Sequence, residues 1–333
     1  MKKFLFIVIL FFGAALVYLS FGELESIAET LRHGHLGFTL LAIVVQLAWL
    51  VVTGFSYLSL YRVLGMNGTL YTMSLMMAAA NFVNIVMPSA GMGGIAVFIN
   101  DATRRGQSPG KVTVVSVLFV FLDYLAFLCV LGLGLIVLFR RNDLDPSEIT
   151  ASLVILFIAT CLGFLLYLGS KSADALGNAL AWMARVVNRA TRPFLHREYL
   201  SEARAHEFAH EIAADLQALP GRWASLIPPF LLVLAGKALM MGILTLSFLT
   251  FEVPFSLGVI VGGFSISYLF LIVSPTPAGI GIVEGIMPLA LSSLKVQWSQ
   301  AVIITLAYRA ITFWFPLGIG AIALRHITRE SRS

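Results

Sequence analysis

The sequence predicts an all-α polytopic membrane protein, and three observations support this fold class. Hydrophobic residues make up 59% of the chain and charged residues 12%, and the mean hydropathy is +0.92. This composition is too apolar for a soluble domain. The apolar residues form runs of about 20 residues, the length that crosses a bilayer as a helix. Two runs are broken by proline and glycine, which is typical of a site at membrane depth.

Six apolar runs are long enough to be full spans. They lie at residues 4–21, 36–60, 112–139, 149–169, 225–250 and 298–324. The first follows Met1-Lys2-Lys3, and no clean small-x-small cleavage site comes after it. We therefore interpret it as an uncleaved span rather than a signal peptide.

Two further apolar stretches, 70–100 and 255–294, are each interrupted near the middle. The breaks run from Met87 to Gly94 and from Val273 to Glu284. Proline removes a backbone donor, and glycine permits backbone conformations that other residues resist. Each stretch is a re-entrant hairpin or a pair of short spans, and both possibilities return the chain to the side it came from.

The basic residues predict the orientation through their excess in cytoplasmic loops. With the N-terminus inside, the cytoplasmic side receives Arg62, Arg104, Arg105, Lys111, the arginines of the 170–224 segment and those of the tail. Only Arg32, Arg140, Arg141 and Lys295 fall outside. We expect a multi-pass protein of the bacterial inner membrane with both termini in the cytoplasm. The net charge of +5 then needs no nucleic-acid partner.

This orientation predicts an inverted repeat within a single membrane domain of residues 1–333. Residues 36–139 form the first repeat, and residues 225–325 form the second with the opposite direction across the membrane. Gly93 precedes Asp123 by 30 residues, and Gly279 precedes Arg309 by the same number. Such repeats are typical of transporters, although two unrelated hairpins remain the alternative.

The segment 170–224 joins the two repeats and has helical periodicity. Its apolar face carries Leu176, Leu180, Met183 and Val187. We expect a cytoplasmic helix at the membrane interface, broken near Pro193. Binding of a partner protein is the alternative role.

Four ionisable residues fall inside predicted membrane segments: Asp123, Lys237, Glu284 and Arg309. Each unpaired charge at a helix centre costs about 2.5–3.5 kcal/mol, so they must pair or face water. We predict that Asp123 pairs with Arg309, because the repeat places them symmetrically. The pair either locks the halves together or forms a site where Arg309 or Lys237 binds an anionic headgroup.

The breaks themselves supply further candidate site residues. A short helix should start near Gly94 and another near Gly281, and helix N-termini favour anions. Glu284 either complements the second helix dipole or takes part in transport. Asn81 and Asn84 share one helix face and line a cavity or join helices. The remaining candidates are Pro88, Gly93, Pro277 and Gly279.

One motif argues for an enzyme. His206-Glu207-Phe208-Ala209-His210 matches the H-E-x-x-H pattern of zinc proteases. A third ligand is needed, and none stands out, since Ala213 stands where the longer form has glycine. We expect no metal, no cofactor and no enzyme activity, and keep a zinc-dependent membrane hydrolase as the weakest alternative.

The chain resembles the transmembrane region of lysylphosphatidylglycerol synthases, a flippase-like membrane family related to the multiple peptide resistance factor. The resemblance lies in Asn84-x-x-x-Pro88 leading to Gly93-Gly94, in Pro277 to Glu284, and in Tyr308-Arg309 followed by Trp314 and Pro316. Ala278 departs from the family pattern, which tends to have a glycine there. The resemblance implies lipid translocation. It also implies that aminoacylation needs a soluble transferase domain, so we expect none from residues 1–333.

We therefore predict translocation of an anionic phospholipid or envelope lipid through a polar groove between the repeats. Membrane lipids are the expected partners. The alternative is an accessory or scaffold protein for hopanoid, glycolipid or cell-envelope lipid assembly, which would bind envelope-lipid synthesis proteins.

Overall fold

The computed structural model describes residues 34–86, 92–141, 146–195, 201–217, 224–274 and 276–330. Within these ranges the chain forms helices joined by turns, with no strand. Five helical segments are long and apolar enough to cross a membrane: Leu36–Val63, Pro109–Arg140, Ser152–Lys171, Ala224–Thr250 and Trp298–Arg329. They confirm the multi-pass fold class and five of the predicted spans. The sixth, 4–21, lies outside the described residues.

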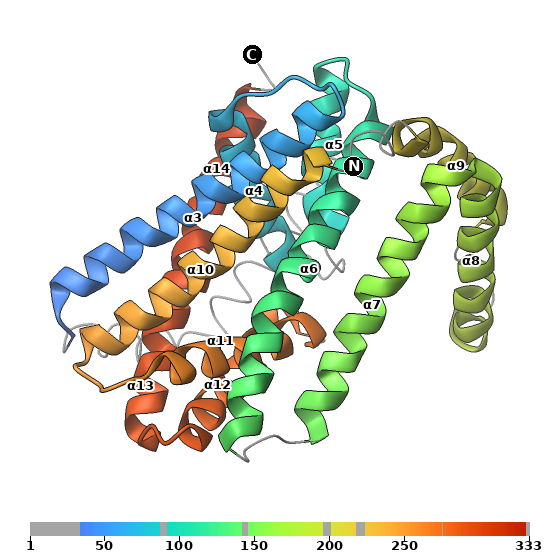
Figure 1. Ribbon diagram of the computed structural model, residues 1–333. Coiled ribbons are helices and arrows are strands. Elements are labelled where there is room, and N and C mark those ends of the chain that lie inside the picture. The colour runs from blue at the N-terminus through green and yellow to red at the C-terminus, as the bar shows by residue number, and fades with distance from the viewer. Residues whose placement is uncertain are drawn as a thin grey trace.

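The long helices follow the predicted spans closely (Figure 1). They are α3 (Leu36–Val63), α6 (Pro109–Arg141), α7 (Pro146–Lys171) and α10 (Ile227–Thr250). The last span is α13 (Trp298–Arg309), one π-helical turn η3 (Ala310–Trp314) and α14 (Phe315–Glu330). Extra residues in a helical turn are frequent at functional sites, and this turn directly follows Arg309.

Each broken stretch becomes two short helices, as predicted. The first gives α4 (Leu70–Val86) and α5 (Met92–Arg104). The second gives α11 (Leu257–Val273), the short turn η2 (Pro277–Gly279) and α12 (Ile282–Ser293). Three of these helices, α4, α11 and α12, are apolar but too short to be full spans, because a crossing needs about 20 residues.

Helices α3 and α10 end in the same way, and the next helix begins in the same way. Gly65 and Glu252 both have positive φ, and the N–H that follows each one bonds back five residues, to Tyr61 O at 2.8 Å and to Phe248 O at 3.0 Å. Thr69 and Ser256 then cap α4 and α11, each accepting a backbone N–H three residues on. Two distant parts of the chain therefore share one local fold.

The two parts run in opposite directions. The His35 N–H at the start of α3 donates to Thr250 O at the end of α10, at 2.8 Å, so these helices are antiparallel (Figure 1). Helix α4 packs on α14 of the other half, and α11 packs on α6. Two inverted repeats would pack in this way; the boundaries 36–139 and 225–325 stay a prediction.

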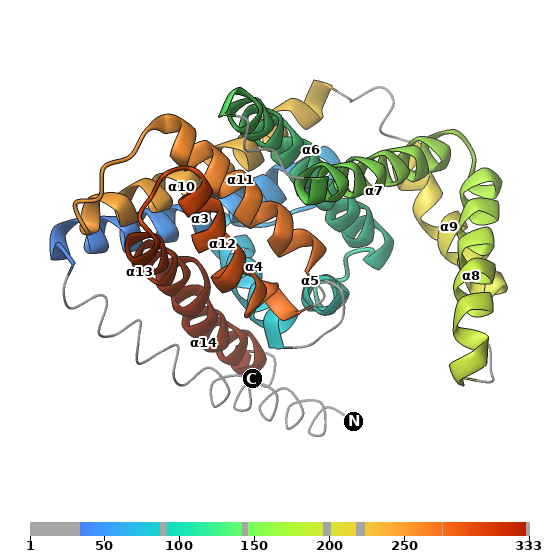
Figure 2. The same ribbon diagram turned by 90° about the horizontal axis from the view of Figure 1, so that it is seen from below.

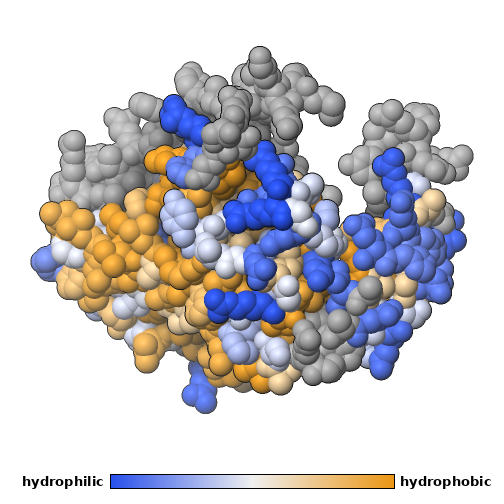
Figure 3. All heavy atoms as spheres, turned by 90° about the horizontal axis from the view of Figure 1, so that it is seen from above, coloured by the Kyte–Doolittle hydropathy of each residue, from blue (hydrophilic) through white to orange (hydrophobic). Residues whose placement is uncertain are grey.

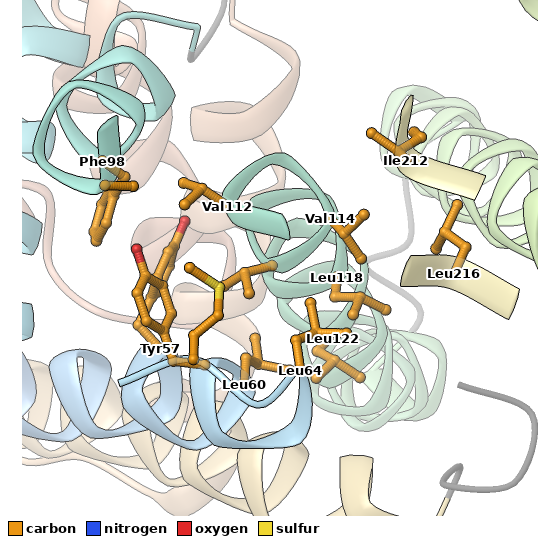
Figure 4. Close-up of a cluster of buried hydrophobic side chains, with 14 of the residues drawn as sticks. Tyr57, Leu60, Leu64, Phe98, Val112, Val114, Leu118, Leu122, Ile212 and Leu216 are labelled. Carbon is orange, nitrogen blue, oxygen red and sulfur yellow. The ribbon is translucent and has the colours of Figure 1, made fainter. Parts of the chain in front are cut away.

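Two large apolar clusters lie toward opposite ends of the bundle. The first includes Tyr57 and Leu60 of α3 and Leu64 just after it, with residues of α5, α6 and α9 (Figure 4), and the Tyr57 ring stacks on Phe98 with 4.5 Å between the ring centres. The second is built mainly from α10, α11, α12 and α13. Helix α6 leaves the first cluster after Leu122 and enters the second at Val130. The interval between the clusters contains Asp123.

The predicted amphipathic segment forms a pair of packed helices, α8 (Ala173–Leu195) and α9 (Glu202–Gln217). Helix α8 includes Pro193 and ends two residues later, at Leu195. Ile212 and Leu216 of α9 face Val114 and Leu118 of α6 (Figure 4). Figure 2 shows α8 and α9 at one side of the molecule, with α7 leading to them.

Basic side chains mark one end of the bundle. Besides α6 and α13, which end in Arg140-Arg141 and in Arg309, four other helices carry a basic residue in the last turn: Arg62 in α3, Arg104 in α5, Lys171 in α7 and Arg329 in α14. These four helices all end at the top of Figure 1, and Figure 3 shows hydrophilic residues gathered over that end. The grouping fits the predicted orientation, although the identity of the cytoplasmic side stays a prediction.

Candidate functional site at mid-depth

The centre of the bundle contains a buried lysine and aspartate in direct contact. Lys237 Nζ donates to Asp123 Oδ1 at 2.7 Å, and the two side chains are only 5% and 22% exposed. Lys237 also donates to the Tyr268 hydroxyl at 2.5 Å, and that hydroxyl donates to Asp123 Oδ2 at 3.4 Å. The three polar groups therefore form a closed ring of hydrogen bonds.

The three residues line one cavity of about 160 Å³ between α3, α4, α6, α10 and α11. That volume is more than ten times the roughly 10–15 Å³ that one water molecule needs. The other lining residues are Trp49, Thr53, Ser56, Met77, Phe119, Val233, Gly236 and Met240. Asp123 stands near the middle of α6 and Lys237 near the middle of α10, so the cavity lies about halfway along both spans.

The predicted pairing of Asp123 with Arg309 is wrong, because Asp123 pairs with Lys237 and Arg309 pairs with Glu284. The 30-residue spacings were counted from glycines of the breaks. The helix starts give a different register: α6 begins at Pro109 and α13 at Trp298, 189 residues later. That offset matches Asp123 with Thr312 in the π-helical turn, so the repeat does not bring Asp123 and Arg309 into equivalent places.

Arg309 instead binds the second break of its own half. Its Nε donates to Glu284 Oε1, its Nη2 donates to Ala278 O at 3.2 Å, and its guanidinium lies 4.4 Å from the Phe313 ring centre. Glu284 Oε2 in turn accepts the Gly281 N–H at 2.8 Å. Glu284 thus satisfies a free donor at the start of α12, in the first turn, where its charge can also complement the helix dipole.

The backbone of the second break is held in an unusual conformation. Ala278, Gly279 and Gly281 all have positive φ, at 49°, 71° and 78°. Thr276 Oγ1 closes the turn by donating to Ile280 O at 2.9 Å. Arg309 clamps the carbonyl of the strained Ala278, which indicates that it fixes the shape of the break. Pro277 lies in the same turn, in η2.

The first break is tied by Asn84 rather than by a charge. Asn84 Oδ1 accepts the Gly94 N–H at 2.6 Å, near the start of α5. Gly93 precedes it in that first turn, and Pro88 lies outside the described residues. The end of α4 also meets the second break, since Ile85 and Val86 pack with Ala278 and Ile280. The end of α4 and the second break are therefore neighbours in the fold.

Asn81 lies on α4 beside a separate and much smaller cavity. This cavity measures about 10 Å³ and includes Gln46 and Pro316 in its lining. That volume is near the lower limit for a single water molecule. Asn81 and Asn84 were predicted to share one polar helix face. They have different surroundings, because Asn84 bonds to the first break and Asn81 lines the small cavity.

The H-E-x-x-H segment lies on α9, away from the central cavity. His210 Nε2 is 3.2 Å from Asp174 Oδ1 of α8. Within the described part of the chain, no three His, Cys, Asp or Glu side chains come together as a metal site would require. Nearby on α9, burial raises the pKa of the Asp215 carboxyl, and the Lys111 ammonium opposes the rise.

A comparison with family models supports the resemblance seen in the sequence. The model described as the lysylphosphatidylglycerol synthase transmembrane region matches residues 5–320, nearly the whole chain. The chain belongs to this family. No individual curated protein matches it significantly. As a member of the lysylphosphatidylglycerol synthase transmembrane family, it is a multi-pass membrane protein of a lipid-related family.

Sequence reasoning missed several residues of the central site, among them the hydroxyl residues Thr53 and Ser56 and two aromatic residues. Tyr268 completes the ring with Asp123 and Lys237, and Trp49 lines the cavity from α3. Both are aromatic residues inside long apolar runs, where they are hard to distinguish from packed or lipid-facing side chains. The polar tip of Tyr268 in an otherwise apolar helix was the available signal.

Proposed function

We propose that this member of the lysylphosphatidylglycerol synthase transmembrane family translocates lipids, with the headgroup passing through the Lys237–Asp123 cavity. The acyl chains would stay in the bilayer. The main support is one observation: a buried ion pair lines a cavity of about 160 Å³ at mid-depth, in the interval between the two apolar clusters. Intramembrane charges beside a cavity are typical of substrate pathways.

In this proposal, the two halves of the chain move relative to each other. We take residues 36–139 and 225–325 as inverted repeats that rock against each other about the central cavity. The clamp of Arg309 on Ala278 and Glu284 would hold the second break in one shape. The π-helical turn after Arg309, followed by Pro316, is a place where α13 and α14 can change their relative angle.

A liposome assay tests the proposal directly. Purified protein is placed in vesicles that contain lipids with a fluorophore on the acyl chain, and a membrane-impermeant reductant bleaches the outer leaflet. A translocator exposes the inner-leaflet lipids as well. We expect wild type to bleach nearly all of the dye and Lys237→Met to bleach only the outer half.

The matched control is Lys171→Met, which removes an exposed lysine at the end of α7. It should behave like wild type. If wild-type vesicles protect the inner leaflet as empty vesicles do for each lipid tested, the translocation proposal fails. The scaffold role in envelope-lipid assembly would then be the function to pursue.

A further inference from the structure

The central cavity carries one negative and one positive group, which restricts what it can bind. Asp123 and Lys237 neutralise each other when no ligand is present. A net-anionic headgroup that takes Lys237 leaves the Asp123 carboxylate without a cationic partner at membrane depth, with only the Tyr268 hydroxyl donating to it. A zwitterionic headgroup gives each side chain a new partner, because its phosphate faces Lys237 and its ammonium faces Asp123. Since unpaired charges are costly in the bilayer, charge balance favours the zwitterion.

The hydroxyl groups of the cavity refine this conclusion. Thr53 Oγ1 donates to Trp49 O at 2.8 Å, and Ser56 Oγ donates to Thr53 O at 2.7 Å. A hydroxyl has one hydrogen, so both oxygens present only lone pairs to a ligand. The Asp123 carboxylate is also an acceptor. An ammonium with N–H groups can satisfy these acceptors, whereas a quaternary ammonium has no hydrogen to offer.

The Lys237 ammonium can move away from Asp123 and leave its position to the ammonium of a ligand. Its Nζ lies 4.0 Å from the centre of the Tyr268 ring, and Trp49 and Phe119 also line the cavity. Aromatic faces attract cations, so the position that the lysine ammonium occupies also suits a ligand ammonium. Lysine has a flexible four-carbon stem and can turn toward a phosphate.

From these contacts we infer that the cavity selects zwitterionic phospholipids whose headgroup ends in a primary ammonium. The phosphate of the lipid takes the place of Asp123 as the partner of Lys237. The ammonium of the lipid takes the place of Lys237 beside Asp123, Thr53 and Ser56. This inference rests on the proposed translocation function and names its substrate class. It replaces the anionic phospholipid that the sequence suggested.

The experiment compares three lipids with the same fluorescent acyl chain in vesicles of phosphatidylcholine. They are phosphatidylethanolamine, phosphatidylcholine and phosphatidylglycerol, and the label is kept off the headgroup so that the ammonium stays free. We expect the initial rate of inner-leaflet exposure to be highest for phosphatidylethanolamine. The ratio to phosphatidylglycerol should reach about tenfold, equivalent to about 1.4 kcal/mol.

Charge variants give the sharpest readout. Asp123→Asn leaves Lys237 as the single charge, so it should reverse the order and favour phosphatidylglycerol. The double variant Asp123→Asn/Lys237→Met lacks the lysine on which translocation depends, so it should move neither lipid faster than empty vesicles do; the comparison of the three lipids in wild type tests the inference if Asp123→Asn does not fold. Lys171→Met should keep the wild-type order. Size-exclusion profiles establish that each variant is folded.

The outcomes separate the inference from the function on which it rests. Equal rates for all three lipids, or a preference for phosphatidylglycerol in wild type, would overturn the headgroup assignment while translocation stands. Equal rates for phosphatidylethanolamine and phosphatidylcholine would overturn the requirement for N–H donors. If no lipid moves faster than in empty vesicles, both proposals fail.

Discussion

The buried pair of Lys237 and Asp123 should be strongly coupled in stability, and a double-mutant cycle measures this coupling. The two charged atoms lie 2.7 Å apart, with the lysine side chain only 5% exposed. Removing one partner of a buried pair costs about 3–5 kcal/mol, because the other charge stays buried without compensation. Lys237→Met and Asp123→Asn should each lower the free energy of unfolding by about that amount.

The double variant is expected to recover most of this loss. With both charges gone, no uncompensated group remains, and neutral replacements of buried pairs are often tolerated. The coupling energy between the two positions should therefore be about 3 kcal/mol or more. Unfolding of the purified protein in mixed micelles, followed by circular dichroism, gives the four free energies.

Arg105 and Asp101 provide the matched control. Their charged atoms lie at a similar distance, 2.8 Å, and the arginine side chain is 45% exposed and the aspartate 16%, so water reaches the cation of this pair but not that of Lys237 and Asp123. Exposed pairs four residues apart on a helix contribute only about 0.3–0.5 kcal/mol. A coupling at Lys237 and Asp123 as small as that of the control would refute the reasoning, and so would a double variant as unstable as the single variants.

Three further outcomes follow from the two breaks. Gly279→Ala should lower the free energy of unfolding more than Gly281→Ala in the same assay. Both glycines have positive φ, but a Cβ at Gly279 would lie 2.6 Å from Val283 Cγ2, whereas a Cβ at Gly281 would meet open space. Equal losses of stability would contradict the crowding argument. Glu284→Gln keeps an oxygen for the Gly281 N–H but weakens the bond to Arg309, so the protein should fold with reduced stability; an unchanged free energy of unfolding would contradict the role of the Glu284 charge in holding Arg309. Asn84→Ala should cost about 0.5–2 kcal/mol, as for other lost caps, and an unchanged free energy of unfolding would show that the Gly94 N–H finds another acceptor.

Most of the helical layout was predictable because lipid imposes simple rules on sequence. Apolar runs of about 20 residues must be helices, and proline with glycine must interrupt them. The predicted span 112–139 became α6 (Pro109–Arg141), and the stretch 255–294 became α11 and α12 on either side of a turn with positive φ. The caps at Thr69 and Ser256 were not predicted, although a polar residue before an apolar helix is a typical N-cap.

The candidate site was predictable in content but not in arrangement. Sequence alone determined that Asp123, Lys237, Glu284 and Arg309 must find partners, because an isolated charge in the bilayer is too costly. It could not determine which carboxylate meets which cation, since that depends on the relative placement of helices that are far apart in the chain. Only the tertiary structure placed Lys237 against Asp123 and Tyr268 beside the cavity, and bound Arg309 to its own break. The physical reason is that repeat symmetry in the sequence does not determine ion pairing. Each charged side chain pairs with the nearest opposite charge that helix packing brings to it.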